Sequence, residues 1–294
     1  MIRPRPAPLN LLLCATVLLG CSKGPPAPAP APPPSPLEEL VIQKVSADLS
    51  RPEPGAVYWQ GVQQGIVTLT AQPMITPRPE KTTTGSVLVQ ALHDGAHVAF
   101  RLQWKDTEKS EAGRLGQFSD ALALEFPMKD GDPPPVMMGA KGDPVHLFHW
   151  RAQYQRDKEQ GKPEMKTLYP NGSIDMYPMD FKEARGGTTE DKEKFSPGVA
   201  QGNPQSFPKE GVDEIIAEGF STSAVQQGHG SKAAGEWKEG AWTLVIVRPL
   251  AIEGGSSLKP GRPSNIAFAV WQGGKAEVGS RKCVTMSWTP VKVQ

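Results

Sequence analysis

The chain has 294 residues, with 32 Lys and Arg against 31 Asp and Glu, and three cysteines. A formal charge of +1 without a basic stripe offers nothing that attracts nucleic acid, so we exclude nucleic-acid binding. This length suits one large domain or a sandwich with insertions.

The first twenty residues have the pattern of a secretion signal. Two arginines form a basic start, and the apolar run Leu9–Leu19 is too short to span a bilayer as a stable helix. The end of this run, Leu18-Leu19-Gly20-Cys21, resembles the lipobox of bacterial lipoproteins. We therefore expect residues 1–20 to be removed and Cys21 to be acylated. An ordinary signal peptide cut near the same place is the alternative.

Acylation predicts a protein that is lipid-anchored in the periplasm of a Gram-negative bacterium. Two or three acyl chains suffice for stable anchoring. Ser22 rather than Asp follows the cysteine, which in the sorting rule of enteric bacteria slightly favours the outer membrane over the inner membrane. Residues 21–36 then form a Pro/Ala-rich tether in extended polyproline II. Residues 37–294 are the expected folded domain.

The cysteines limit the chemistry of this domain. Cys14 leaves with the signal and Cys21 carries lipid, so Cys283 is the single free thiol and no intrachain disulfide is available. The sequence contains no Cys-x-x-Cys-His, which excludes covalently attached c-type haem.

From residue 37 onward the pattern is mostly strand-like. The expected strands are short, rich in Val, Phe and Trp, and bounded by Gly, Asp or Pro. They are Ser86–Leu92, Ala96–Trp104, Asp120–Phe126, Val145–Trp150, Trp242–Leu250, Asn265–Trp271 and Lys282–Trp288. Turns at Asp94-Gly95 and at Gly240 predict hairpins. Helix is expected only as a turn or two at Glu108–Gly113 or Lys209–Glu218. The sequence therefore predicts an all-β fold, a two-sheet β-sandwich with a few short helices.

Residues 151–235 break this pattern. They are charged and rich in Gly and Pro, with little periodicity, as in RDKEQGKPEMK and EARGGTTEDKEK. A loop of this length in a compact domain is usually functional or contacts a partner. We interpret it as a long irregular insertion on the sandwich.

A Pro-rich loop between two expected strands carries Met137-Met138-Gly139. Loops run over the surface, so methionines there are poor core material, and thioethers are soft metal ligands. The pair suggests a cofactor, with packing as the alternative. The nearby His146 and His149 are three residues apart and lie on opposite faces of a strand, so they cannot both reach one metal from it.

Lys282 is the second unusual residue. If its segment is a strand, it shares a face with Val284, Met286 and Trp288. A lysine on an apolar face is costly unless it is paired, neutralised or coordinated, and burial favours the neutral amine that a metal requires. Alternatively, Lys282 lies at the strand end and extends its amine to water. We expect Met286 to be a packing residue.

The order of several segments resembles that of the haem-b-binding γ subunits of the ethylbenzene dehydrogenase type, found also in dimethyl sulfide dehydrogenase and selenate reductase complexes. The matching segments are ALHDGAHVAFRLQWKD (91–106), SDALALEFP (119–127), VMMGAKGDPVHLFHW (136–150), GEWKEGAWTLVIVRPL (235–250), and IAFAVWQGG followed by GSRKCVTMSW (266–288). The resemblance extends from about Val57 to the end. Each segment is moderately specific, and their shared order is considerably stronger.

This resemblance implies a β-sandwich that holds one non-covalent b-type haem ligated by a methionine and a lysine. By position the methionine is Met138, with Met137 as the adjacent alternative, and the lysine is Lys282. Thioether plus amine fills both axial positions of the iron, which favours electron transfer over binding of oxygen or substrate. A bis-histidine or His/Met haem is the competing ligand set.

Candidates for the wall of the haem pocket are the aromatic residues Trp150, Trp271, Phe126 and Phe148, with ordinary sandwich core as their alternative. Arg248 interrupts an apolar run. It would pair either with a haem propionate or with a carboxylate.

We therefore expect a lipid-anchored electron-transfer protein. The sequence has no supported nucleophile–His–acid motif and no nucleotide-binding glycine pattern, so an independent enzyme is not expected. In the resembling complexes the γ subunit docks on an iron–sulfur subunit joined to a molybdenum catalytic subunit, and a c-type cytochrome is the outside partner. The alternatives are a haem-free sandwich that binds a carbohydrate or other small ligand, and a structural lipoprotein.

Overall fold

The computed structural model describes residues 33–111, 114–172, 197–207, 209 and 211–294. The expected signal peptide, the lipidation site Cys21 and most of the tether lie outside the described residues. Within the described part of the chain, no helix is long and apolar enough to cross a membrane.

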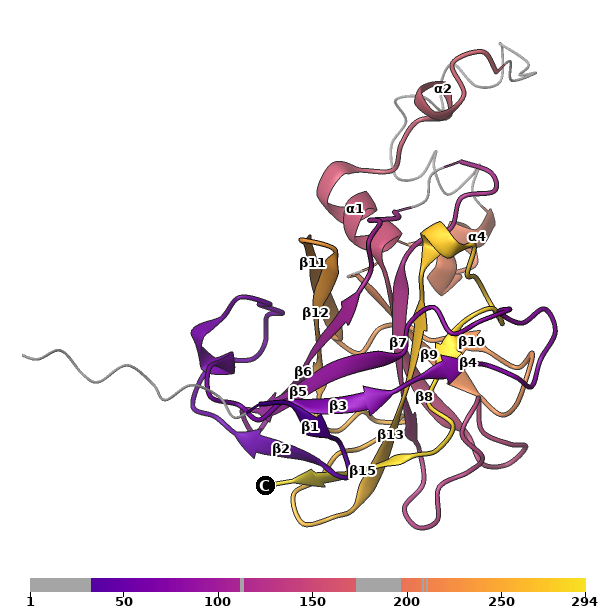
Figure 1. Cartoon of the computed structure of the whole chain (residues 1–294). Helices are drawn as coiled ribbons and strands as arrows, with labels where there is room; N and C mark the ends of the chain where they lie inside the picture. The colour runs from indigo at the N-terminus through magenta and orange to yellow at the C-terminus, as the bar shows by residue number, and fades with distance from the viewer. Residues whose placement is uncertain (1–32, 112–113, 173–196, 208, 210) are drawn as a thin grey trace, which may run out of the picture.

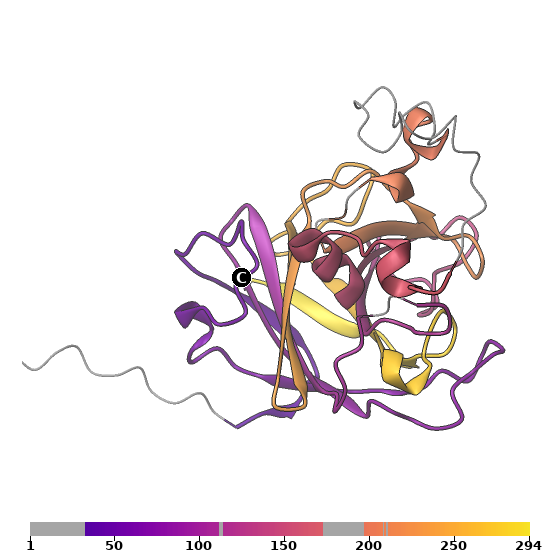
Figure 2. The ribbon, with the colours of Figure 1, turned by 90° about the horizontal axis from the view of Figure 1, so that it is seen from above.

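The strands form two packed layers, as the all-β prediction requires (Figures 1 and 2). The first layer has the order β10-β9-β8-β7-β13, and the second has the order β5-β6-β12-β11. The strands β15 and β2 join β13 of the first layer to β5 of the second, so one continuous path of paired strands folds over on itself.

The first layer comprises β4 (Thr70–Ala71), β7 (Ala121–Pro127), β8 (Val145–Arg151), β9 (Val212–Ala217), β10 (Ala224–Val225), β13 (Ser264–Trp271) and β14 (Cys283–Val284). The second comprises β1 (Ser35–Pro36), β3 (Gly65–Thr68), β5 (Ser86–His93), β6 (His97–Lys105), β11 (Lys232–Lys238) and β12 (Ala241–Pro249). The joining strands are β2 (Leu40–Lys44) and β15 (Thr289–Val293).

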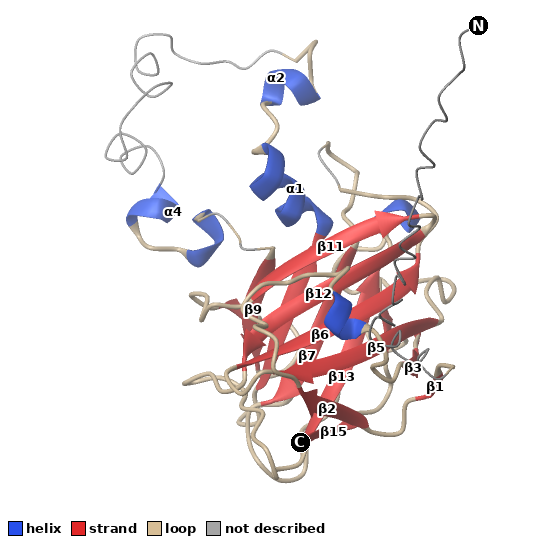
Figure 3. Ribbon diagram, turned by 90° about the vertical axis from the view of Figure 1, so that its left-hand side faces the viewer, coloured by secondary structure: helices blue, strands red, loops and turns tan. Residues whose placement is uncertain are grey.

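The helices are short and lie outside the two layers. They are α1 (Ala152–Gln160), α2 (Met165–Leu168) and α4 (Pro197–Ala200), with 3-10 turns η1 (Val57–Trp59), η2 (Pro204–Ser206) and η3 (Gly273–Lys275). Figure 3 shows α1, α2 and α4 together at one end of the strands.

Aromatic side chains from both layers meet in the core between them. The ring centres of Trp150 on β8 and Trp242 on β12 are 5.0 Å apart, and those of Trp104 and Trp150 are 6.1 Å apart. Gly235 makes this approach possible, because a Cβ there would lie 2.9 Å from the Trp150 ring. Burying each large apolar side chain contributes about 1.5–3 kcal/mol, so this inner core is the main source of stability.

Most predicted strands are confirmed within one or two residues, and so are the hairpins. Asp94 N donates to His97 O at 3.1 Å in the β5–β6 turn, where Gly95 has a φ of 101°. The predicted strand Lys282–Trp288 is wrong in extent, since only Cys283–Val284 pairs as β14. The strand β15 at the end of the chain was not predicted.

The helix predicted at Lys209–Glu218 is also wrong. Its residues 212–217 form β9, which pairs with β8 along its length. Residues 108–111 form no helix either. Tertiary pairing overrides the weak helical pattern here, because β9 completes the edge of a sheet that would otherwise leave the backbone groups of β8 unpaired.

The irregular insertion expected at 151–235 contains more regular structure than its composition indicates. It begins with α1 and supplies β9, β10 and the start of β11. Residues 173–196 of this region lie outside the described residues. At the other end, β1 takes in Ser35–Pro36, the last two residues of the expected tether, which pair with β3.

Candidate functional site

The first layer has an outer face as well as the inner face that packs in the core. Because side chains alternate along a strand, the outer face receives every second residue of β13, β7, β8 and β9. The register places them in cross-strand rows. These rows are Trp271–Ala121–Arg151, Ala269–Ala123–His149–Asp213 and Ala267–Glu125–Leu147–Ile215. The alanines in these rows have small side chains, so they leave space above the sheet.

A cavity of about 420 Å³ lies on this outer face, and we call it the outer-face cavity. Its lining includes Met137, Met138, His149, Arg151, Trp271 and Lys282. A smaller extension of about 20 Å³ reaches Glu125, Ala267 and Ala269. The volume falls in the range of roughly 300–1,000 Å³ that is usual for ligand and cofactor sites. The structure therefore brings the methionine pair and Lys282, which are far apart in sequence, to one cavity.

The methionine loop has an unusual backbone. Met137, Met138 and Gly139 have φ values of 85°, 76° and 69°, all in the left-handed region. Such conformations cost about 1–3 kcal/mol for each non-glycine residue and persist where the surroundings enforce them, often at functional sites. Gly139 is required at its position, since a Cβ would lie 2.6 Å from Asp143 O.

Hydrogen bonds on both sides hold Met138 in this conformation. Its amide donates to Glu125 Oε1 at 3.0 Å, and its carbonyl accepts from Gly219 N at 2.6 Å. Its side chain packs with the apolar group that contains Leu147 and Trp288. The loop is thus tied to β7 and to the turn after β9, which directs both methionines toward the outer-face cavity.

Lys282 enters the cavity from the residue before β14. Its Nζ lies 4.9 Å from the centre of the Trp271 ring, a cation–π distance. Its carbonyl accepts from Gln72 N at 3.0 Å, which fixes the backbone. Burial lowers the pKa of the amine, and the nearby Glu125 charge opposes that change. Desolvation therefore favours the neutral amine, the form that can donate a lone pair.

Glu125 lies under both halves of the site. It is only 9% exposed, and burial raises the pKa of its carboxyl to about 7. The hydrogen bond from the Met138 amide and the charge of Lys282 both lower this pKa, but burial is the larger effect. Glu125 is therefore coupled to the methionine loop by a bond and to Lys282 by charge.

His149 is a further donor on the cavity wall. Its ring centre lies 4.9 Å from that of Trp271, and its Nε2 has no hydrogen-bond partner among the described residues. Burial holds the pKa of His149 well below its usual value, so the ring is neutral. No group of three or more His, Cys, Asp and Glu that could hold a metal ion occurs in the described parts of the chain.

A family model described as ethylbenzene dehydrogenase matches residues 56–283. The chain belongs to the ethylbenzene dehydrogenase family. This confirms the resemblance seen in the order of the sequence segments.

Curated relatives match along most of the chain. A candidate haem subunit of a respiratory nitrate reductase from Haloferax mediterranei is 25% identical over 253 residues, 85% of this chain and 71% of that protein. The chlorate reductase subunit gamma of Ideonella dechloratans is 24% identical, covering 84% of this chain and 81% of its own. The dimethylsulfide dehydrogenase subunit gamma of Rhodovulum sulfidophilum is 24% identical, covering 80% and 73%.

Among solved structures, a family 9 carbohydrate binding module from Caldicellulosiruptor kristjanssonii, in complex with glucose, aligns with a TM-score of 0.42 and 7% identity. The alignment covers 87% of this chain and 95% of the module. At this TM-score the likeness does not bear on the ligand.

In this member of the ethylbenzene dehydrogenase family, the predicted wall residues separate. Trp271 lines the cavity, whereas Trp150, Phe126 and Phe148 lie in the inner core. The cause is strand alternation. Trp150 is two residues from Phe148, so both point into the core, and it is adjacent to His149, which points to the cavity on the opposite face.

Arg248 also lies away from the outer-face cavity. It is fully buried in the inner core, where its guanidinium donates to Ser256 Oγ at 2.7 Å and to Ser256 O at 2.6 Å. It lies 4.6 Å from the centre of the Phe148 ring. The geometry therefore gives Arg248 hydrogen-bond partners within the inner core, and neither a carboxylate in the described chain nor the outer-face cavity lies at its guanidinium. Met286, expected to pack, is 46% exposed.

Sequence reasoning missed several polar residues of the cavity, among them Arg151, Tyr154 and Asp213. Tyr154 Oη donates to Asp213 Oδ2 at 2.8 Å, and burial raises the pKa of this tyrosine. Arg151 could have been found from strand alternation, because it is two residues after His149 on β8 and therefore lies on the same face. Strand alternation could not identify Asp213, because the sequence predicts a helix at Lys209–Glu218 and not the strand β9.

Proposed function

We propose that this chain is a b-type haem electron-transfer protein, lipid-anchored at Cys21 in the periplasm, that relays single electrons as a subunit or partner of a molybdoenzyme-type redox complex. The observation that carries the proposal is the outer-face cavity, which brings Met137, Met138 and Lys282 together. The names of the relatives, subunits of nitrate reductase, chlorate reductase and dimethylsulfide dehydrogenase, support the class of complex.

The residues of the cavity fit a haem. Met138 offers a soft thioether and Lys282 an amine whose protonated form is disfavoured by burial, so both present lone pairs. The strained, hydrogen-bonded loop orients Met138 before any ligand arrives. Leu147 and Trp271 supply apolar parts of the cavity wall. Bound haem would supply a one-electron couple, with Met138 and Lys282 as the residues that would hold its iron, and a thioether ligand would favour the ferrous form.

Purification of the full chain after expression with ample haem tests the proposal. We expect a red protein with the low-spin spectrum of b-type haem, extractable with acid acetone because no covalent attachment exists. A colourless protein would overturn the proposal and favour the haem-free ligand-binding sandwich.

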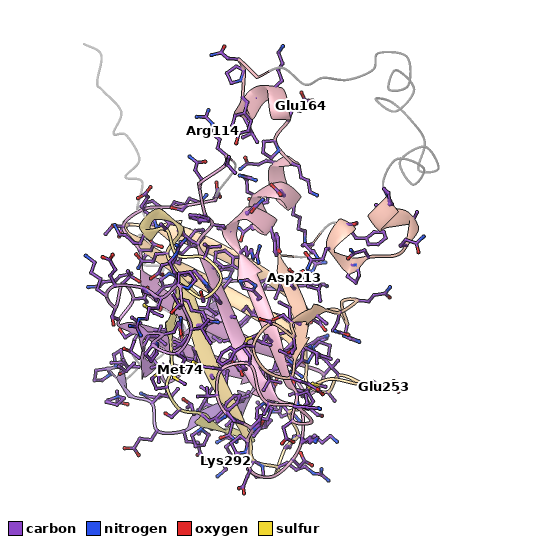
Figure 4. All side chains as sticks on the ribbon, turned by 90° about the vertical axis from the view of Figure 1, so that its right-hand side faces the viewer. Met74, Arg114, Glu164, Asp213, Glu253 and Lys292 are labelled. Carbon is purple, nitrogen blue, oxygen red and sulfur yellow. The ribbon has the colours of Figure 1, made fainter. Side chains whose placement is uncertain are left out.

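Ligand variants test the assignment of the axial residues. Met138→Ala and Lys282→Ala should each abolish the low-spin spectrum, whereas Met137→Ala should keep it. Met74→Ala is the matched control, because Met74 is 61% exposed and lies on the surface (Figure 4). Retention of the low-spin spectrum in both ligand variants would show that the assignment is wrong. Loss in Met137→Ala and Lys282→Ala, with retention in Met138→Ala, would move the methionine ligand by one residue.

The anchor and the partners have separate tests. Cys21→Ser should release the protein from the membrane fraction and stop its labelling with palmitate. Purification of the native protein should retain iron–sulfur or molybdenum-containing subunits, and reduced complex should pass electrons to a soluble c-type cytochrome. Failure of either result contradicts that part of the proposal without affecting the haem.

A further inference from the structure

Arg151 lies at one end of the outer-face cavity. It is the last residue of β8 and pairs with Ala121 in the same row as Trp271. Leu147, in the apolar group with Met138, is four residues earlier on the strand, a separation of about 13 Å at roughly 3.3 Å per residue. Asp213, one row away from Arg151, lies toward the helix-bearing end of the sheet (Figure 4). The cavity therefore has a thioether end and an arginine end.

Within the described part of the chain, the guanidinium of Arg151 has no counterion. It forms no ion pair with any carboxylate in the described ranges of the chain. The acidic residue of the cavity wall, Asp213, is already engaged by Lys209 Nζ at 2.7 Å and by the hydroxyl of Tyr154 at 2.8 Å. The neighbouring His149 is neutral, so this end of the cavity carries an uncompensated positive charge.

Tyr154 holds the guanidinium in place. The Cζ of Arg151 lies 5.2 Å from the centre of the Tyr154 ring, and the hydrogen bond to Asp213 fixes that ring. A planar guanidinium on an aromatic face keeps its N–H donors directed to the side, where a carboxylate can accept two of them. Arg248 differs in this respect, because Ser256 already occupies its donors.

We propose that Arg151 binds a carboxylate of the ligand in the outer-face cavity, namely a propionate of the haem, and so sets the orientation of the macrocycle. This inference rests on the proposed function. Arg151 is a positioning residue, since the carboxylate lies at the edge of the macrocycle and takes no part in the electron transfer.

Titration of the haem-free full chain with haem b and with haem b dimethyl ester tests this assignment. The ester keeps the iron and the ring and removes both negative charges. Arg151→Gln should raise the Kd for haem b about ten- to hundredfold, the range for loss of a charge-assisted pair, and should change the Kd for the ester by less than about threefold. Arg151→Lys should recover part of the affinity, and each variant should keep the wild-type low-spin spectrum at saturation.

Arg262→Gln is the matched control, because it removes the same charge from an exposed ion pair with Asp130. It should bind both haems as the wild type does. Equal weakening of haem b and ester by Arg151→Gln would assign Arg151 to packing against Tyr154 and overturn the inference, as would no weakening of either. If the wild type binds neither haem, the proposed function itself fails together with this inference.

Discussion

The two faces of β8 carry similar residue types and use them differently. The inner face presents His146, Phe148 and Trp150, and the outer face presents Leu147, His149 and Arg151. Each face therefore combines a histidine with an apolar side chain, and each lies near a basic residue, Arg248 inside and Lys282 outside.

Polar groups on the inner face are joined to one another. Arg248 donates to Ser256, whose amide donates to His146 Nδ1 at 3.1 Å. His229 Nδ1 lies 2.6 Å from Glu214 Oε2, which is 3.7 Å from His146 Nε2. We call these residues the inner-face cluster. On the outer face, His149 Nε2 has no hydrogen-bond partner and the guanidinium of Arg151 has no ion-pair partner within the described chain. The inner face also has unpaired atoms, His146 Nε2 and Trp150 Nε1, but these are fully buried and lie away from the cavity. Because buried polar groups are normally paired, unpaired ones around a cavity indicate a ligand, whereas paired ones indicate structure.

The largest expected effect is on the inner face. Arg248→Met removes the donors that pair with Ser256 and with the carbonyls of Pro249 and Leu250; Leu250 O keeps its bond from Leu258 N, but the bonds to Ser256 Oγ and Ser256 O are lost. We expect the free energy of unfolding to fall by about 3–5 kcal/mol, because two buried hydrogen bonds from a charged group are lost at about 1.5–3 kcal/mol each. Urea unfolding of the haem-free protein measures this. A loss below about 1 kcal/mol would contradict the distinction between the two faces.

Opposite pH dependence of the two faces is the next expected effect. Glu125 on the outer face has a folded-state pKa of about 7 against an ordinary 4.5, so the folded state holds its proton longer and stability falls as pH rises through that window. The pKa of His146 on the inner face is lowered from 6.5 to about 4, mainly by burial, so its contribution makes stability rise between those values.

Variants separate these two contributions. Between about pH 4.5 and 7, the free energy of unfolding of Glu125→Gln should rise more steeply than that of the wild type. The difference between the two proteins should change by up to about 3 kcal/mol over this window. His146→Gln should flatten the rise between about pH 4 and 6.5. Unfolding of the haem-free protein in urea at a series of pH values measures both slopes. Identical slopes in wild type and Glu125→Gln would show that the carboxyl titrates normally.

The smallest effect, and one of opposite sign, is expected at Lys282. The described structure gives its desolvated amine no carboxylate within ion-pair distance, so Lys282→Met should raise the free energy of unfolding of the haem-free protein by about 1 kcal/mol. The same variant should lose the Met/Lys low-spin spectrum with haem. Destabilisation by Lys282→Met would mean that the lysine is structural, like Arg248.

Much of the architecture was predictable because it depends on local patterns. Alternation of apolar residues located β5, β6, β7, β8, β12 and β13, and glycine turns located the hairpins. Alternation also placed His146 and His149 on opposite faces. It failed for β9, whose residues Asp213 and Glu214 are buried only because Tyr154 and His229 supply partners from elsewhere in the chain.

The sequence by itself determined the strand periodicity, the methionine loop with its glycine, and the out-of-place lysine at 282, since each is a property of neighbouring residues. Only the tertiary structure decided which face of the sheet carries the cavity. In sequence, Trp150 cannot be told from Trp271, nor Arg248 from Arg151. The second layer covers Trp150 and Arg248, whereas Trp271 and Arg151 are left at the cavity. Burial depends on what packs against a face, and strands distant in the chain supply that packing.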